Sequence, residues 1–125
     1  MTDVDLIHKE LVYQVVGCAM KIHQELGYGF LEKVYENSLM HLLNKENIQA
    51  KQQYPVPVYF DSVSVGEYYA DIMIENKILV ELKTAERITN AHFAQVLNYL
   101  KATGIRLGLL LNFGPRKLEY ERIIK

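Results

Sequence analysis

The sequence predicts a mixed α/β fold with the element order ααβββαββ around a mixed sheet. Three observations support this prediction: two apolar patterns with helical spacing come first, three strand-like segments follow, and a further helical segment precedes a nearly continuous apolar run. A helix between two strands of one sheet implies a right-handed parallel crossover. Half of the 125 residues are hydrophobic, which is enough for one packed core, so we expect residues 1–125 to form a single domain.

The first two predicted elements are amphipathic helices. One runs from about Val4 to Leu26, where apolar residues recur at spacings of three and four, and Gly27 is a typical helix stop. The second runs from about Phe30 to Asn47, after a short glycine-containing turn. Its predicted apolar side consists of Leu31, Val34, Leu39, Leu42 and Leu43.

Three predicted strands follow these helices. Two prolines interrupt Gln52 to Phe60, which favours an edge strand, where missing backbone donors are tolerated. Gly66 to Ile74 and Ile78 to Thr84 are rich in Tyr, Ile, Val and Leu and read as a hairpin around Glu75-Asn76-Lys77.

The C-terminal part predicts one more helix and two strands. Thr89 or Asn90 can cap the helix, and Gly104 can end it. Leu107 to Phe113 is a nearly continuous apolar run, typical of a strand covered on both faces, and part of Leu118 to Ile124 forms the last strand. The predicted core stripe of the helix is Phe93, Val96, Leu97 and Leu100.

Charged residues lie in the two strands of the predicted hairpin. Alternation puts Leu79, Glu81 and Lys83 on one face, and we expect the opposite face to be the core face. A three-residue loop sets Asp71 directly across from Glu81, with side-chain bases roughly 5 Å apart, close enough to share a divalent cation. The alternative is that these are solvated charges on a half-exposed sheet. Metal binding is favoured because facing carboxylates in apolar strands are destabilising unless a cation or Lys83 compensates them.

Composition excludes several other classes of function. Fourteen basic and fifteen acidic residues give a formal net charge of -1, so there is no global basic field for coating DNA. The four histidines show no zinc-ligand spacing with a cysteine, and there is no glycine-rich phosphate loop or Ser or Cys nucleophile motif. The lone Cys18 indicates a buried structural thiol in a reducing compartment. With no membrane-length apolar run and no signal-peptide pattern, we expect a soluble, cytoplasmic protein without a membrane partner.

These residues together resemble a known superfamily. Asp71, nine intervening residues and Glu81-x-Lys83 look like the motif of the PD-(D/E)xK phosphodiesterases, with Ala70 in place of the variable Pro. That resemblance implies an αβββαβ core, to which this chain adds an N-terminal helix. Gly29-x-x-Glu32-x-x-Tyr35 is also similar to the signature of the GxxExxY proteins, a resemblance that extends to Tyr69-Ala70-Asp71 and to residues 108–114.

The resemblance implies a metal site and a set of supporting residues. Mg²⁺ or Mn²⁺ would be held by Asp71, Glu81, the backbone carbonyl of Leu82 and Glu32, while Lys83 would act on the attacking water and on the phosphate. Four further residues are implied as supporting: Glu36, one turn after Glu32; Tyr35 of the signature; and Gln95 and Tyr99, which resemble the Q-x-x-x-Y element of RecB-like nucleases. The alternatives are an exposed carboxylate pair for Glu36 and ordinary helix surface for Gln95 and Tyr99. For His92 the two alternatives are a phosphate contact and an exposed structural histidine.

Two functions follow from these expectations. The first is a metal-dependent nuclease that hydrolyses a nucleic-acid backbone, with DNA favoured over RNA as the substrate. The second is a non-catalytic module that keeps the nuclease fold and binds nucleic acid or protein. Cleavage of single-stranded, nicked or branched DNA in Mg²⁺ or Mn²⁺ separates the two. Because so small a domain offers little surface for specificity, a homodimer or a protein partner is a further expectation.

Overall fold

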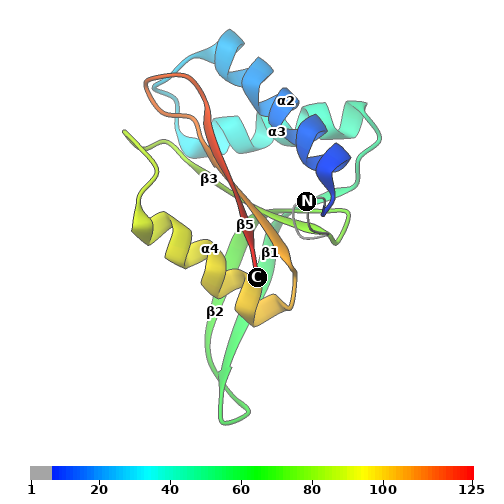
Figure 1. Ribbon diagram of the computed structural model, residues 1–125, viewed down its shortest axis with the longest axis vertical. Helices are drawn as coiled ribbons and strands as arrows, with labels where there is room; N and C mark the ends of the chain where they lie inside the picture. Colours follow the sequence, from blue (N-terminus) through cyan, green and yellow to red (C-terminus); the bar gives the residue numbers. More distant parts are fainter. Residues whose placement is uncertain (1–6) are drawn as a thin grey trace.

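The computed structural model describes residues 7–125, and it confirms the predicted fold class and element order (Figure 1). The predicted start of the first helix, at Val4, lies outside the described residues. No helix among residues 7–125 is long and apolar enough to cross a membrane. The elements are α2 (Lys9–Leu26), α3 (Glu32–Lys45), β1 (Ala50–Phe60), β2 (Val63–Ile74), β3 (Ile78–Lys83), α4 (Asn90–Thr103), β4 (Leu107–Asn112) and β5 (Glu119–Ile124).

The five strands form one mixed sheet in the order β1-β2-β3-β4-β5. Neighbouring strands are antiparallel except β3 and β4, which are parallel and are connected through α4. The predicted parallel crossover is therefore confirmed. Pro55 and Pro57 lie on β1 at the edge of the sheet, as their missing backbone donors require.

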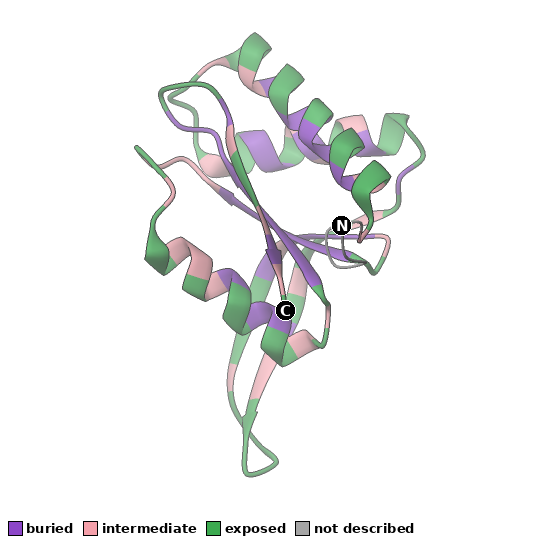
Figure 2. Ribbon diagram, viewed as in Figure 1, coloured by how far each residue is buried: buried purple, intermediate pink, exposed green. Residues whose placement is uncertain are grey.

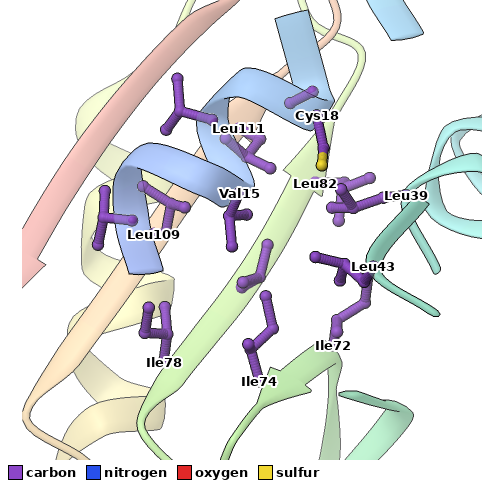
Figure 3. Close-up of a cluster of buried hydrophobic side chains, with 14 of the residues drawn as sticks. Val15, Cys18, Leu39, Leu43, Ile72, Ile74, Ile78, Leu82, Leu109 and Leu111 are labelled. Atoms are coloured by element: carbon purple, nitrogen blue, oxygen red, sulfur yellow. The ribbon is translucent and has the colours of Figure 1, made fainter. Parts of the chain in front are cut away.

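Helices cover the sheet on both sides, and each side has its own core. Side chains of α2 and α3 pack on one face, where Val15, Leu39 and Leu43 point toward apolar residues of β2, β3 and β4 (Figure 3). On the other face, Val96 and Leu100 of α4 pack in a second cluster. The two central strands are consequently buried along nearly their whole length (Figure 2).

This second core corrects the prediction that only one face of β3 is a core face. Ile78, Val80 and Leu82 do lie in the α2–α3 core, but Leu79, on the face of the charged residues, is fully buried beneath α4. Strand alternation assigns residues to faces without telling what covers each face. The crossover helix covers the second face, so the charged residues lie at the end of a buried strand.

Two helical core stripes also differ from the predicted ones. In α3, Leu31 is 80% and Val34 is 37% exposed, because the helix begins only at Glu32 and turns Tyr35 and Glu36 inward instead. In α4, Leu97 is 38% exposed and Tyr99 is buried. Of the two predicted caps of α4, Thr89 is the one found, and the predicted Gly104 stop is confirmed.

The hairpin of β1 and β2 projects beyond the rest of the sheet (Figure 1). Only Ile72–Ile74 of β2 pair with β3, whereas β1 and β2 pair with each other as far as Phe60 and Val63. We call residues 55–69 the arm. Large apolar side chains exposed on it are Tyr59, Phe60, Val63, Val65, Tyr68 and Tyr69.

Candidate active site

The register of the central hairpin brings Asp71 and Glu81 together. Ile72–Ile74 pair with Ile78–Val80 around the predicted three-residue turn, and continuing this register puts Asp71 opposite Glu81. The regular pairing ends at that point. The backbone N–H of Leu82 donates to Oδ2 of Asp71 at 2.8 Å, so a carboxylate takes the place of a backbone acceptor. The strands separate where the two acids meet.

Glu81 is a buried acid with an unsatisfied oxygen. It is 3% exposed, and its Oε1 makes no hydrogen bond with any described residue. Burial raises the pKa of its carboxyl to about 10, a hydrogen bond with Asp71 and that residue's charge add to the rise, and Lys83 opposes it. In the chain alone the carboxyl therefore holds a proton at neutral pH. A cation bound at this oxygen would favour the ionised form instead.

Lys83 and Glu32 complete the group of charges. Lys83 is partly buried at the end of β3, and Glu32 is the first residue of α3. Burial raises the pKa of Glu32, the Asp71 charge raises it further, and Lys83 lowers it. The charges of Asp71 and Lys83 thus act on the carboxyls of both Glu32 and Glu81 near the end of β3.

Tyr35 shapes the loop that leads into Glu32. Its hydroxyl donates to the carbonyl of Gly27 at 2.6 Å and accepts from the N–H of Phe30 at 3.3 Å. Its ring stacks on Phe113 with centroids 4.7 Å apart. Gly29 within this loop has a φ of +121°, a conformation that favours glycine. In the Gly29-x-x-Glu32-x-x-Tyr35 pattern, Gly29 and Tyr35 therefore stabilise the loop that precedes Glu32, and the loop fixes where α3 begins.

Glu36 is buried, and both of its carboxylate oxygens form hydrogen bonds. The alternative of an exposed carboxylate pair is therefore wrong for this residue. It is 2% exposed and its Oε2 forms an ion pair with Lys33 at 3.0 Å. The same oxygen accepts from the side-chain amide of Gln52 at 2.7 Å, and Gln53 donates to both oxygens at 3.3 Å. Glu36 ties α3 to the edge strand, and its charge raises the pKa of Glu32.

Gln95 and Tyr99 lie on the α4 side of the acids. The Gln95 amide donates to the Tyr99 hydroxyl at 3.3 Å. Burial raises the pKa of Tyr99, and the charge of Glu81 raises it further. His92 instead forms a capping box with Thr89: its Nδ1 accepts from the Thr89 N–H at 3.1 Å. The structural interpretation of His92 is therefore confirmed, although the side chain is only partly exposed.

Asn112 is a positioning residue that sequence reasoning missed. It is fully buried beside Lys83 in the β3–β4 ladder, and its side chain accepts from the N–H of Ala85 at 2.9 Å and donates to the carbonyl of Ala85 at 3.0 Å. It also donates to Glu119 at 2.8 Å. A Cβ on Gly114 would lie 2.3 Å from the Ala85 carbonyl oxygen, so only glycine fits there. A signal was present, because Asn112 is the single polar residue that interrupts the end of an apolar run.

The donors present fit a hard divalent cation bound by few protein ligands. Among residues 7–125, no three His, Cys, Asp or Glu side chains gather in an arrangement that could hold a metal. The pair of Asp71 and Glu81 offers carboxylate oxygens, one of them unsatisfied. Mg²⁺ is commonly held by one or two carboxylates with water and phosphate oxygens completing its shell. The pair thus suits a cation that substrate helps to bind.

Paired acids and a lysine at the end of a central strand of an α/β fold are the arrangement expected of a nuclease-type domain. The profile of the PD-(D/E)XK nuclease superfamily matches residues 9–123, and the chain belongs to that superfamily. Members of that superfamily usually use divalent metals.

One solved structure similar to this chain is the crystal structure of SSO0001. It aligns with a TM-score of 0.56 and 20% identity, over 75% of this chain and 50% of that chain. This likeness concerns the fold alone, and the chain spans half the length of that protein. A comparison with curated proteins found no match.

Proposed function

We propose that this protein is a metal-dependent phosphodiesterase that hydrolyses the backbone of nucleic acids, DNA in preference to RNA. The observation that carries the proposal is the unsatisfied Oε1 of buried Glu81 beside Asp71. A buried acid beside a partly buried one lowers the stability of the fold unless a cation offsets the two. A binding role for a cation gives a reason for their position.

The carboxylates of Asp71 and Glu81 and the backbone carbonyl of Leu82 would hold the cation. Glu32, the further ligand that the sequence suggests, shares the electrostatic environment of Asp71 and Lys83 but forms no three-ligand cluster with the acidic pair among residues 7–125. The bound ion would supply an activated water and polarise the phosphate. The Leu82 N–H fixes Oδ2 of Asp71 and so orients the other oxygen of that carboxylate.

Lys83 has a different role because an ammonium group cannot be a metal ligand. Its three N–H donors would orient the attacking water and stabilise negative charge that develops on the phosphate. Asn112 supports this role by fixing the backbone at Ala85, two residues beyond Lys83, while the Lys83 carbonyl accepts from the N–H of Phe113 at 2.8 Å. Tyr99 and Gln95, joined by a hydrogen bond, would form the wall of the site on the α4 side.

The test is a cleavage assay with defined substrates. Purified protein is incubated with end-labelled single-stranded, nicked and branched DNA, and with RNA of matched sequence, in Mg²⁺, Mn²⁺ or EDTA. We expect cleavage with metal and none with EDTA or with Asp71→Asn. Glu25→Gln, which removes an exposed carboxylate from α2, is the matched control and should cleave like the wild type. A folded wild type that cleaves no substrate, or an equally active Asp71→Asn, contradicts the proposal.

A non-catalytic binding module is the second candidate. The absence of a three-ligand cluster among residues 7–125 and the protonated state of Glu81 in the chain alone favour it. It predicts that nucleic acid binds without cleavage and that Mg²⁺ leaves the melting temperature unchanged.

We also propose that the chain belongs to the narrower GxxExxY family. The support of the Glu32 loop by Tyr35 and the φ of Gly29 favour this assignment, because they give that spacing a structural purpose.

A further inference from the structure

A groove of about 820 Å³ lies between the arm and α4. Residues 57–59 and Tyr68 line one wall, and one side of α4 lines the other. Its volume falls within the roughly 300–1,000 Å³ typical of small-ligand sites. The groove is therefore large enough to take a flat organic group between the two walls.

The arm wall presents aromatic rings to solvent. Tyr59 is 64% and Tyr68 is 54% exposed, although both line the groove. The ring of Tyr68 lies 6.0 Å from that of Tyr99, centroid to centroid, at an angle of 43°. Exposed aromatic faces of this kind stack on nucleobases of any sequence.

The helix wall complements a nucleotide in shape and charge. Ala91 and Ala94 leave space on α4, while the side chains of Gln95 and Asn98 carry hydrogen-bond donors and acceptors suited to the edge of a base. Lys101 brings a positive charge suited to a phosphate. No Asp or Glu is among the described residues that line the groove.

Tyr99 and Gln95 relate the groove to the candidate active site. Both residues line the groove, and Tyr99 contacts Tyr68. The charges of Glu81 and Asp71 raise the pKa of the Tyr99 hydroxyl. With a nucleotide in the groove, the neighbouring phosphodiester linkage would be the one presented to Asp71 and Glu81.

We propose that this groove binds an unpaired nucleotide adjacent to the cleaved linkage, so that the substrate is nucleic acid with a single-stranded segment. The inference rests on the proposed function in that both require nucleic acid at this side of the sheet. A base stacked in a duplex offers no free face to Tyr59 or Tyr68, whereas an unpaired base offers both. Single strands and the unpaired arms of branched DNA therefore fit the groove, and continuous duplex does not.

The test is binding in EDTA, where hydrolysis plays no part. Fluorescence anisotropy of a labelled oligothymidylate is compared with that of a duplex of equal length. We expect tighter binding to the single strand, and a loss on the order of tenfold or more for Tyr68→Ala, as the removal of one stacking partner implies. Tyr68→Phe keeps the ring and should bind like the wild type. Tyr13→Ala, at a 78% exposed site on α2, is the matched control and should also bind normally.

A second variant tests the opposite wall without removing a ring. Ala94→Glu puts a carboxylate into the groove at an exposed helix position, and it should weaken single-strand binding as much as Tyr68→Ala does. Gln14→Glu adds the same charge on α2 and should bind normally. Circular dichroism and melting curves establish that each variant is folded.

Several outcomes overturn the inference: no binding of the single strand by the wild type, equal binding of single strand and duplex, or unchanged binding by both folded groove variants. These outcomes are distinct from failure of the proposed function. Selective binding that Tyr68→Ala and Ala94→Glu weaken, without any cleavage, supports the groove and contradicts the enzyme. Cleavage that both variants perform with unchanged KM and kcat contradicts the groove alone.

Discussion

Replacing Glu81 with glutamine should stabilise the metal-free protein while removing the proposed nuclease activity. The wild-type carboxyl has a pKa of about 10 in the folded chain and an ordinary value of 4.5 when unfolded. Folding above pH 4.5 therefore requires uptake of a proton. Glutamine needs none, and its amide N–H can donate to Asp71 as the protonated acid does.

The size of the effect follows from proton linkage. A folded pKa raised above the unfolded one means that the folded state binds more protons, so stability falls as pH rises from about 4.5 to about 10. A pH of 7.5 is about 3 units above the pKa of the unfolded carboxyl. Keeping the proton in the folded state therefore destabilises the wild-type fold by an amount on the order of 4 kcal/mol. For a chain of this size, removing such a destabilisation raises the melting temperature by roughly 15 °C.

Thermal unfolding in EDTA, followed by circular dichroism between pH 5.5 and pH 9, measures this effect. The gap between Glu81→Gln and the wild type should widen with rising pH, while Glu25→Gln follows the wild type. If Glu81→Gln melts at the wild-type temperature at pH 8, or the two proteins share one pH profile, the reasoning about a buried protonated acid is refuted.

Three other outcomes are expected. Mg²⁺ or Mn²⁺ should raise the melting temperature of the wild type but do much less for Asp71→Asn, since the ion binds the folded state; equal shifts would place the cation elsewhere. Lys83→Ala should keep the fold and the metal-induced stabilisation, yet cleave a hundredfold more slowly or worse, on the order of 3 kcal/mol of transition-state stabilisation. An unchanged rate at matched metal concentration would contradict the role given to Lys83. Asn112→Ala removes the side-chain partners of the partly buried backbone groups of Ala85 and should cost about 3 kcal/mol in unfolding free energy, measured by denaturant titration against Asn44→Ala. Equal stability of the two variants would show that the Asn112 amide does not hold the loop.

Local patterns were sufficient for the hairpin that carries the acids. Strand alternation has a period of two, so the length of the turn decides which residues oppose each other. Three turn residues between Ile74 and Ile78 produce the register found in the structure. The relative position of Asp71 and Glu81 could therefore be predicted without knowing the rest of the fold.

Burial depended on contacts that lie far apart in the sequence. Leu79 is covered because α4 crosses its face, and a pattern within β3 cannot indicate where a later helix will lie. Tyr35 and Glu36 replace Leu31 and Val34 on the inner side of α3 because hydrogen bonds to the Gly27 carbonyl and to Gln52 on β1 set the rotation of the helix.

The supports of the candidate site were missed for a related reason. Asn112 and Ala85 are separated by 27 positions and meet only because β3 and β4 are parallel neighbours. Their contact joins a side chain to a loop backbone, which leaves no periodic pattern in the sequence. A polar residue at the end of an apolar run is the sole local sign of such a contact.

The length of the projecting arm can change without changing the stability of the protein's core. The outer parts of β1 and β2 pair only with each other, so adding or removing two residues in each strand there would leave the sheet order and the acidic pair unchanged. Each such step alters the span of the arm by about 6.6 Å. The length of the hairpin can therefore change in evolution without disturbing the core, and under the proposed binding mode it would set how far along a bound strand the protein makes contact.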